Sequence, residues 1–160
     1  MDPISEQDGS QDWATVPIAT LIEHILARYH RVHRQQLAEL IPLARRVESV
    51  HAEHPACPLG LAEHLDTMAH ELESHMQKEE RILFPLLEQG LPAAGLPPVM
   101  VMRQEHELHL KALERLMELA RQLEVPEGAC KSWQNLLIGL GALRSDLLAH
   151  MKLENEVLFV

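Results

Sequence analysis

The stretch "LESHMQKEERILFP", residues 72–85, combines helical leucine spacing with a histidine and a glutamate four residues apart. The C-terminal stretch "LLAHMKLENEVLFV", residues 147–160, repeats this arrangement. Side chains four residues apart lie on one face of an α-helix. We therefore expect His75 with Glu79, and His150 with Glu154, to interrupt the apolar stripes of two helices.

Composition limits the class of protein. The chain has 160 residues, enough for one domain with its own core. Aromatic residues make up only 3% of it, which favours helices over strands. The net charge of −10, with no basic stripe, argues against nucleic-acid binding.

Targeting and redox signals are also missing from the sequence. The longest run without a charged residue, 89–102, is too short and too rich in proline and glycine to span a membrane. The polar, acidic N-terminus is unlike a signal peptide. Cys57 and Cys130 form no disulfide or zinc-binding pattern, so we expect a cytoplasmic protein.

Proline and glycine divide the chain into four helical segments, which predicts an all-α, antiparallel four-helix bundle. The expected helices run from Ile18 to His51 with a kink at Pro42, from Pro58 to Phe84, from Val99 to Leu123, and from Ala129 to Phe159. Residues 1–14 are predicted to be a disordered lead-in or a cloning boundary, and residues 15–160 a single domain.

Each expected helix carries an apolar stripe at steps of three and four residues, and histidine interrupts every stripe. The first two stripes are Ile22, Leu26, His30, His33, Leu37 and Leu40, then Leu61, Leu65, Met68, Leu72, His75, Glu79 and Ile82. The other two are Val99, Met102, His106, His109, Leu113, Leu116 and Ala120, then Trp133, Leu136, Leu140, Leu143, Leu147, His150, Glu154 and Val157.

The interruptions repeat along the chain. When His150 is aligned with His75, Glu154 falls on Glu79. When His106 is aligned with His30, the histidines three positions later match as well. The two halves therefore read as two copies of one helix pair, related by a pseudo-twofold axis that would bring two half-sites together.

The spacing alone is weak evidence, because random placement of nineteen glutamates and eleven histidines gives roughly one such pair. The position of both pairs on buried stripes is stronger evidence. Two buried carboxylates need a cation, and one ion would leave part of the set uncompensated. Two metal ions, with the carboxylates bridging them, fit a set of four imidazoles and two carboxylates. The expected ligands are His30, His75, Glu79, His106, His150 and Glu154.

Imidazole with carboxylate suits iron, and manganese and zinc equally. His33 and His109 lie one turn beyond a proposed ligand. They are candidates for extra ligands, for hydrogen-bond partners of the ligands or for proton carriers, and we favour the hydrogen-bonding role. The competing interpretation is a plain helical bundle in which these histidines are hydrogen-bonded core residues without metal.

The segments "RYHRVH", "SHMQKEERILFP", "RQEHELH" and "AHMKLENEVLF" resemble those of hemerythrin-like (HHE) domains. The resemblance covers the chain from Thr15 to its end. It is closest to the repair-of-iron-centres (RIC) branch, the YtfE/ScdA/DnrN group. It implies two non-haem irons, joined by an oxo or hydroxo bridge, on the same six residues.

Three features depart from relatives of this kind. Oxygen-carrying hemerythrins place a further histidine and an aspartate where this chain has Leu110 and Asn155. Six protein ligands instead of seven leave more open coordination, which suits small-molecule access or metal release. Family members commonly carry a short cysteine-bearing N-terminal domain that is missing here, and a proline after the final "LF", where this chain has Val160.

The resemblance implies repair of iron–sulfur clusters damaged by nitric oxide or oxidative stress, through donation of labile iron. Damaged iron–sulfur proteins would be its clients, and the protein would be a repair or iron-donor protein more than a turnover enzyme. The alternatives are a di-iron enzyme that reduces nitric oxide or peroxide, and a module that binds or senses NO or O₂. The sequence leaves a homodimer open.

Overall fold

The computed structural model describes residues 11–160. Residues 1–10, most of the predicted lead-in, lie outside the described part. Within residues 11–14, Trp13 is half-buried and its ring stacks on that of His24 with centroids 3.9 Å apart. The first helix of the bundle begins five residues after Trp13, at Ile18.

The first long helix is built from three consecutive segments. These are α2 (Ile18–Ile25), the π-helical turn η1 (Leu26–His30) and α3 (Arg31–Val50). Pro17 precedes the first helical residue, where its missing N–H costs nothing. The helix continues through Pro42 to Val50.

The other helices follow the predicted order. The second comprises α4 (Leu61–Lys78), the π-helical turn η2 (Glu79–Leu83) and α5 (Phe84–Glu88). The third comprises α6 (Pro97–Leu119), followed by the 3₁₀ turn η3 (Arg121–Leu123). The fourth comprises α7 (Lys131–Leu153) and the π-helical turn η4 (Glu154–Leu158). Pro85 does not end the second helix, because it stands in the first turn of α5, where proline is tolerated.

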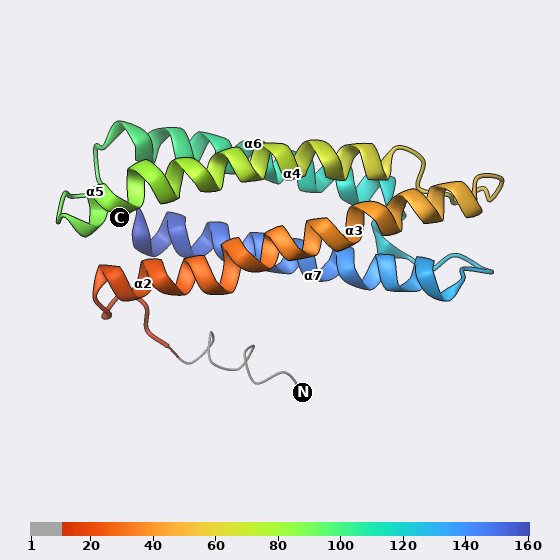
Figure 1. Cartoon of the computed structure of the whole chain (residues 1–160), viewed down its shortest axis with the longest axis horizontal. Helices are drawn as coiled ribbons and strands as arrows, with labels where there is room; N and C mark the ends of the chain where they lie inside the picture. Colours follow the sequence, from red (N-terminus) through yellow and green to blue (C-terminus); the bar gives the residue numbers. More distant parts are fainter. Residues whose placement is uncertain (1–10) are drawn as a thin grey trace.

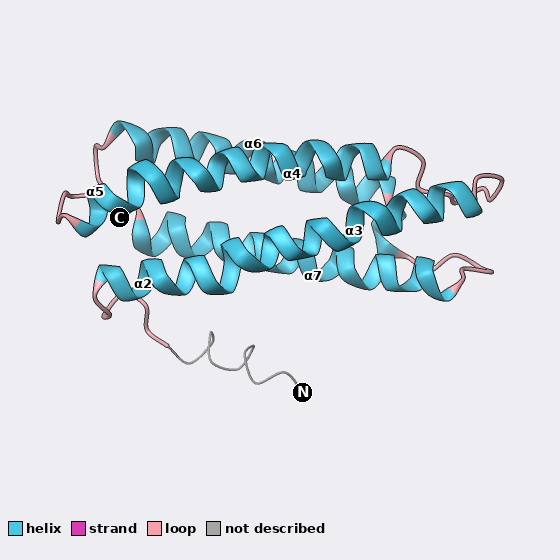
Figure 2. Ribbon diagram, viewed as in Figure 1, coloured by secondary structure: helices cyan, strands magenta, loops and turns pink. Residues whose placement is uncertain are grey.

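The long helices form an antiparallel bundle, as predicted (Figure 1). In this view α4 and α6 run side by side along one layer, and α2, α3 and α7 along the other. The helix α3 contacts both α4 and α7, and α4 contacts α6. Residues 11–160 contain helices, turns and loops and no strand (Figure 2). None of the helices described combines the length and hydropathy needed to cross a bilayer.

The bundle has two apolar clusters with a polar layer between them. The larger cluster joins α3, α4, α6 and α7 and contains Leu65, Leu116 and Leu140. The smaller one joins α2, α5 and the neighbouring helix ends, and contains Ile25 and Phe84. Between them lie the buried polar residues His30, His33, His75, Glu79, His106, His109, His150 and Glu154.

The π-helical turns move the buried stripe by one position, which sequence periodicity did not anticipate. Ile82 was expected in the core but is 53% exposed, whereas Leu83 is buried. A π-turn takes about one residue more than an α-turn, so every later side chain of that helix rotates to a new direction. The same shift buries Leu158 and leaves Val157 half-buried.

The connection between α3 and α4 contains a side-chain cap. Gly60 adopts a φ of +90° immediately before α4, in the left-handed region that favours glycine. The carboxylate of Glu48, in the last turn of α3, accepts the N–H of Gly60 at 2.6 Å and that of Ala62 at 3.0 Å. It thereby satisfies N–H groups that the start of a helix leaves without intrahelical partners.

Replacing Glu48 with Ala should lower the free energy of unfolding by about 1 kcal/mol, the usual order for loss of a side-chain cap. Urea unfolding followed by circular dichroism measures the effect. The matched control is Glu53→Ala, which removes an exposed carboxylate from the same connection. Equal stability of the two variants would contradict the capping role.

Candidate metal centre

The polar layer in the middle of the bundle draws ionisable side chains from all four long helices. Each of its eight residues is at most 6% exposed, and the two glutamates are 0% exposed. The π-helical turns coincide with this layer: η1 ends at His30, η2 begins at Glu79 and η4 begins at Glu154. Such turns re-aim side chains within a helix and are frequent at functional sites.

Two overlapping groups of potential ligand atoms meet in this layer. One consists of His30, His150, Glu79 and Glu154, and the other of His75, His106 and the same two glutamates. Within each group, one atom from every residue lies within 4.8 Å of all the others. Two cations could therefore bind side by side, each with two histidines of its own and both sharing the two carboxylates.

All four histidines of these groups turn Nε2 toward a carboxylate. The Nε2 atoms of His30 and His75 each lie 3.3 Å from Oε1 of Glu79. On the other side, Nε2 of His106 lies 3.0 Å from Oε1 of Glu154, and Nε2 of His150 lies 3.2 Å from Oε2 of the same group. The six residues predicted from the sequence thus face one another.

Several inward-facing atoms in this layer have no hydrogen-bond partner in the described chain. They are Nε2 of His30, His75 and His150, both oxygens of Glu79, and Oε2 of Glu154. A buried carboxylate without a partner is strongly unfavourable, and so is a buried imidazole lone pair. Cations between these atoms would satisfy all of them together, and the mixture of nitrogen and oxygen donors fits iron, manganese or zinc.

Burial keeps four histidines of the layer neutral. It lowers the pKa of His30 to about 4, with His150 adding to the effect, and that of His75 to about 2. The pKa of His33 is lowered to about 3 and that of His109 to about 4 for the same main reason. A neutral imidazole offers a lone pair, so these side chains are ready to act as metal ligands or hydrogen-bond acceptors at pH 7.

The pKa values of the two carboxyl groups are shifted in opposite directions. Burial raises the pKa of Glu79 well above its usual range, and the neighbouring Glu154 raises it further. Burial also opposes ionisation of Glu154, but His150 and hydrogen bonds to the carboxylate hold its pKa well below the usual value. Burial and mutual repulsion therefore oppose two negative charges side by side, and a cation between the two carboxylates would relieve that repulsion.

The outer nitrogens of the same histidines contact a second set of groups. Nδ1 of His30 lies 2.7 Å from Oε2 of Glu80, and Nδ1 of His106 lies 2.8 Å from Oδ1 of Asn155. Nδ1 of His150 lies 3.0 Å from Nε2 of His33. Such contacts orient a ligating ring and fix its tautomer.

The fourth outer contact is longer. Nδ1 of His75 lies 3.6 Å from Oε1 of Glu105. The ring of His109 lies across that of His75, with centroids 4.8 Å apart. His109 contributes no atom to either group of potential ligands.

No sequence pattern pointed to Glu80 or Glu105 as site residues. Each is adjacent in sequence to a predicted ligand, and this adjacency was the only available signal. Glu80 follows Glu79 but contacts His30, which lies far away in the sequence on another helix. Sequence spacing cannot reveal such a contact, because it depends on the helix rotation that η2 sets.

The fold and the paired groups define a four-helix-bundle protein with a buried cation-binding site. The hemerythrin HHE cation-binding domain model matches residues 21–160. The chain is 43% identical to the iron-sulfur cluster repair protein YtfE of Yersinia pseudotuberculosis, over 97% of this chain and 70% of that protein. It is equally identical to YtfE of Citrobacter koseri, over 98% and 71%. The chain therefore belongs to the hemerythrin HHE family and binds metal through this domain.

Metal-free protein should lose stability as the pH falls from about 6.5 toward 4. In this range the unfolded chain binds protons on histidines with an ordinary pKa of 6.5, whereas the folded protein excludes them from His30, His33, His75 and His109. Each histidine contributes up to about 1.4 kcal/mol per pH unit. The raised pKa of Glu79 acts in the opposite sense above 4.5 and reduces the total.

Urea unfolding of chelator-treated protein at intervals between pH 7 and 5 measures this dependence. Added divalent metal at pH 7 should raise the unfolding midpoint, because the folded state alone assembles the site. A flat stability profile over this range would contradict burial of neutral histidines.

Proposed function

We propose that this chain is a di-iron protein that contributes to the repair of iron–sulfur clusters by supplying iron. The observation that carries the proposal is the pair of overlapping ligand groups that share both carboxylates. The repair role is supported by the relatives, which are named iron-sulfur cluster repair proteins. Iron–sulfur proteins damaged by nitric oxide or oxidants are then the recipients, and the cytoplasm is the compartment in which we place the protein.

In this proposal His30 and His150 would hold one iron and His75 and His106 the other, and Glu79 and Glu154 would be available to both. The strength with which the site binds iron would depend on the oxidation state of the metal. Burial lowers the pKa of His30 and of His75, so these two imidazoles can bind metal without first losing a proton. The apolar clusters on both sides of the layer keep bulk water away from the carboxylates.

The ligand assignment predicts different metal losses for bridging and terminal residues. Glu79→Ala should remove both metals, because Glu79 belongs to both groups, whereas His106→Ala should remove about one of the two. Metal analysis of protein purified from iron-replete cells measures the stoichiometry. The control is Glu156→Ala, which removes an exposed carboxylate two residues beyond Glu154. Unchanged metal content in Glu79→Ala would contradict the assignment.

The donor role predicts that reduction makes iron available. After addition of dithionite, the iron-loaded protein should transfer iron to a ferrous chelator, or to an apo iron–sulfur protein with sulfide present, much faster than the oxidised protein does. Absorbance of the chelate, or of the rebuilt cluster, follows the transfer. Iron that stays bound after reduction would overturn the donor role. Steady consumption of nitric oxide by that same protein would favour the reductase alternative.

A further inference from the structure

We propose that the two metal positions are unequal, and that the metal held by His75 and His106 is the one released first. We call the position of His30 and His150 the anchored position, and that of His75 and His106 the open position. The inference rests on the proposed function and deepens it, because it identifies which iron is available for transfer. It is carried by differences between side chains that the internal repeat places at equivalent points.

The first support of the anchored position lies behind His30. Oε2 of Glu80 contacts Nδ1 of His30 at 2.7 Å and also accepts a hydrogen bond from Arg34 at 2.8 Å. The same guanidinium donates two hydrogen bonds to the carboxylate of Glu73, at 2.8 Å and 3.1 Å. The ring of His30 is thus held by a charged network that ties the first helix to the second.

The second support lies behind His150 and is a chain of hydrogen bonds to the protein surface. Nδ1 of His150 lies 3.0 Å from Nε2 of His33, and Nδ1 of His33 lies 3.4 Å from Oε1 of Gln36. The amide nitrogen of Gln36 donates to Asp146 at 2.8 Å, and Arg28 donates to the other oxygen of Asp146 at 2.9 Å.

When Nε2 of His150 binds a metal, the hydrogen bonds from His150 to Asp146 can be donated in only one direction. Nδ1 of His150 must then carry the hydrogen and donate it to His33, which donates in turn to Gln36. The amide of Gln36 donates to Asp146, and a carboxylate can only accept. These hydrogen bonds, which end at Asp146, therefore fix both the orientation and the tautomer of the His150 ring.

The open position lacks the corresponding groups. In the alignment that places His150 on His75, Asn155 stands where the first half has Glu80. In the alignment that places His106 on His30, Leu110 stands where the first half has Arg34. Nδ1 of His106 therefore contacts a neutral amide at 2.8 Å instead of a carboxylate held by an arginine. A charged acceptor makes a hydrogen bond roughly twice as strong as a neutral one.

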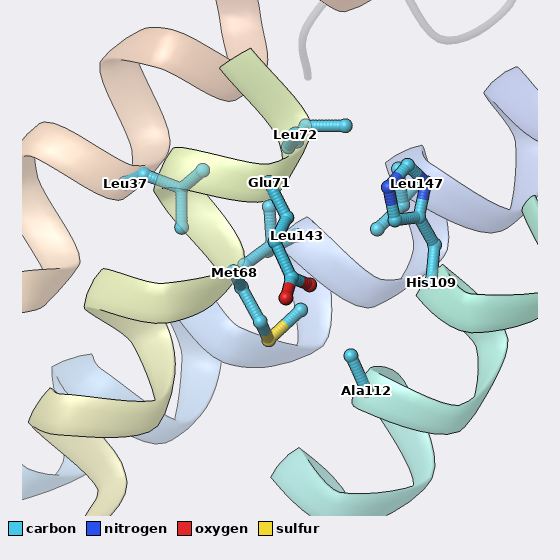
Figure 3. Close-up of a pocket in the computed structure, with 8 residues that line it drawn as sticks. All are labelled: Leu37, Met68, Glu71, Leu72, His109, Ala112, Leu143 and Leu147. Atoms are coloured by element: carbon cyan, nitrogen blue, oxygen red, sulfur yellow. The ribbon is translucent and has the colours of Figure 1, made fainter. Parts of the chain in front are cut away.

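The hydrogen-bonded chain is also interrupted in the second half. Ala112 occupies the position equivalent to Gln36, and His109 the position equivalent to His33. A cavity of about 10 Å³ lies here, lined by Ala112, His109 and Glu71 together with apolar side chains (Figure 3). Glu71 is the repeat equivalent of Asp146. The cavity thus lies among the counterparts of the residues that form the chain in the first half.

His109, which lines this cavity, and His75, which its ring contacts, lack hydrogen bonds at Nδ1 within residues 11–160. Nδ1 of His109 is buried without a hydrogen-bond partner among the described residues. Nδ1 of His75 is 3.6 Å from Glu105, beyond hydrogen-bond range, and Lys78 holds that carboxylate at 3.0 Å and 3.1 Å. The ring of His75 therefore lacks the direct outer contact that orients His150.

Unequal support should produce unequal affinity. Loss of a group that orients a metal ligand commonly weakens binding roughly 10- to 100-fold. Because the anchored position has a charged network behind one histidine and a complete chain behind the other, its metal should leave more slowly. The shared carboxylates do not single out one position, since both belong to each group of potential ligands.

Two variants that each retain one position test the order of release. His106→Ala keeps the anchored position and His30→Ala keeps the open one. Each protein is loaded with Co²⁺, and loss of its visible absorbance is followed after addition of excess chelator. His30→Ala should release Co²⁺ about 10-fold faster or more. Equal rates, or faster release from His106→Ala, would overturn the inference, provided that circular dichroism shows both variants folded.

A reciprocal pair of variants tests the same point with both positions intact. Wild-type protein loaded with two Co²⁺ ions should release them in a fast and a slow phase. Gln36→Ala, which copies the second half into the first, should accelerate the slow phase. Ala112→Gln, which adds an amide at the cavity, should slow the fast phase. The control is Gln35→Ala, an exposed neighbour on the same helix.

The outcomes separate this inference from the proposed function. Release of two ions at a single rate would overturn the inequality, and rates unchanged in both variants would overturn its origin in the groups behind the histidines; neither result affects iron donation. Failure of the wild-type protein to bind two metals would overturn the proposed site itself, and the inequality with it.

Discussion

The burial of Glu79 and Glu154 in the centre of the bundle is the constraint on which the rest of the structure depends. Each carboxylate is fully buried, and together they have three oxygens without a hydrogen-bond partner in the described chain. Such an arrangement persists in a folded protein only when something compensates the charge. Two cations held among the four imidazoles of the layer would compensate it. The stability of the folded protein should therefore depend on whether cations occupy the polar layer.

The bundle accommodates this layer by local changes in helix geometry. The π-helical turns η1, η2 and η4 lie at His30, Glu79 and Glu154, while α6 reaches its histidines as a regular α-helix. These turns rotate the following residues, so that Leu83 and Leu158 pack in the smaller apolar cluster. The apolar clusters on both sides then enclose the site and lower its access to water.

The pseudo-twofold repeat supplies the symmetry of the six proposed ligands, and departures from the repeat make their surroundings differ. The four histidines and two glutamates match when the halves are aligned, whereas the outer groups behind them do not. Glu80, Arg34 and Gln36 have neutral or apolar counterparts in the other half. A duplicated helix pair can thus build a two-metal site, and later divergence outside the ligands can make the two positions chemically distinct.

The sequence by itself determined the all-α bundle, the helix order and the six inward residues. Period and spacing suffice for this, because residues i and i+4 share one face of any helix, and buried charge on four such faces has to converge. Only the tertiary structure decided that Ile82 is exposed, since π-turns obey no simple periodicity. It also decided that Glu80 contacts His30 and that a cavity lies beside Ala112. These contacts join residues on different helices, and their partners depend on how each helix is rotated and docked, which no local pattern encodes.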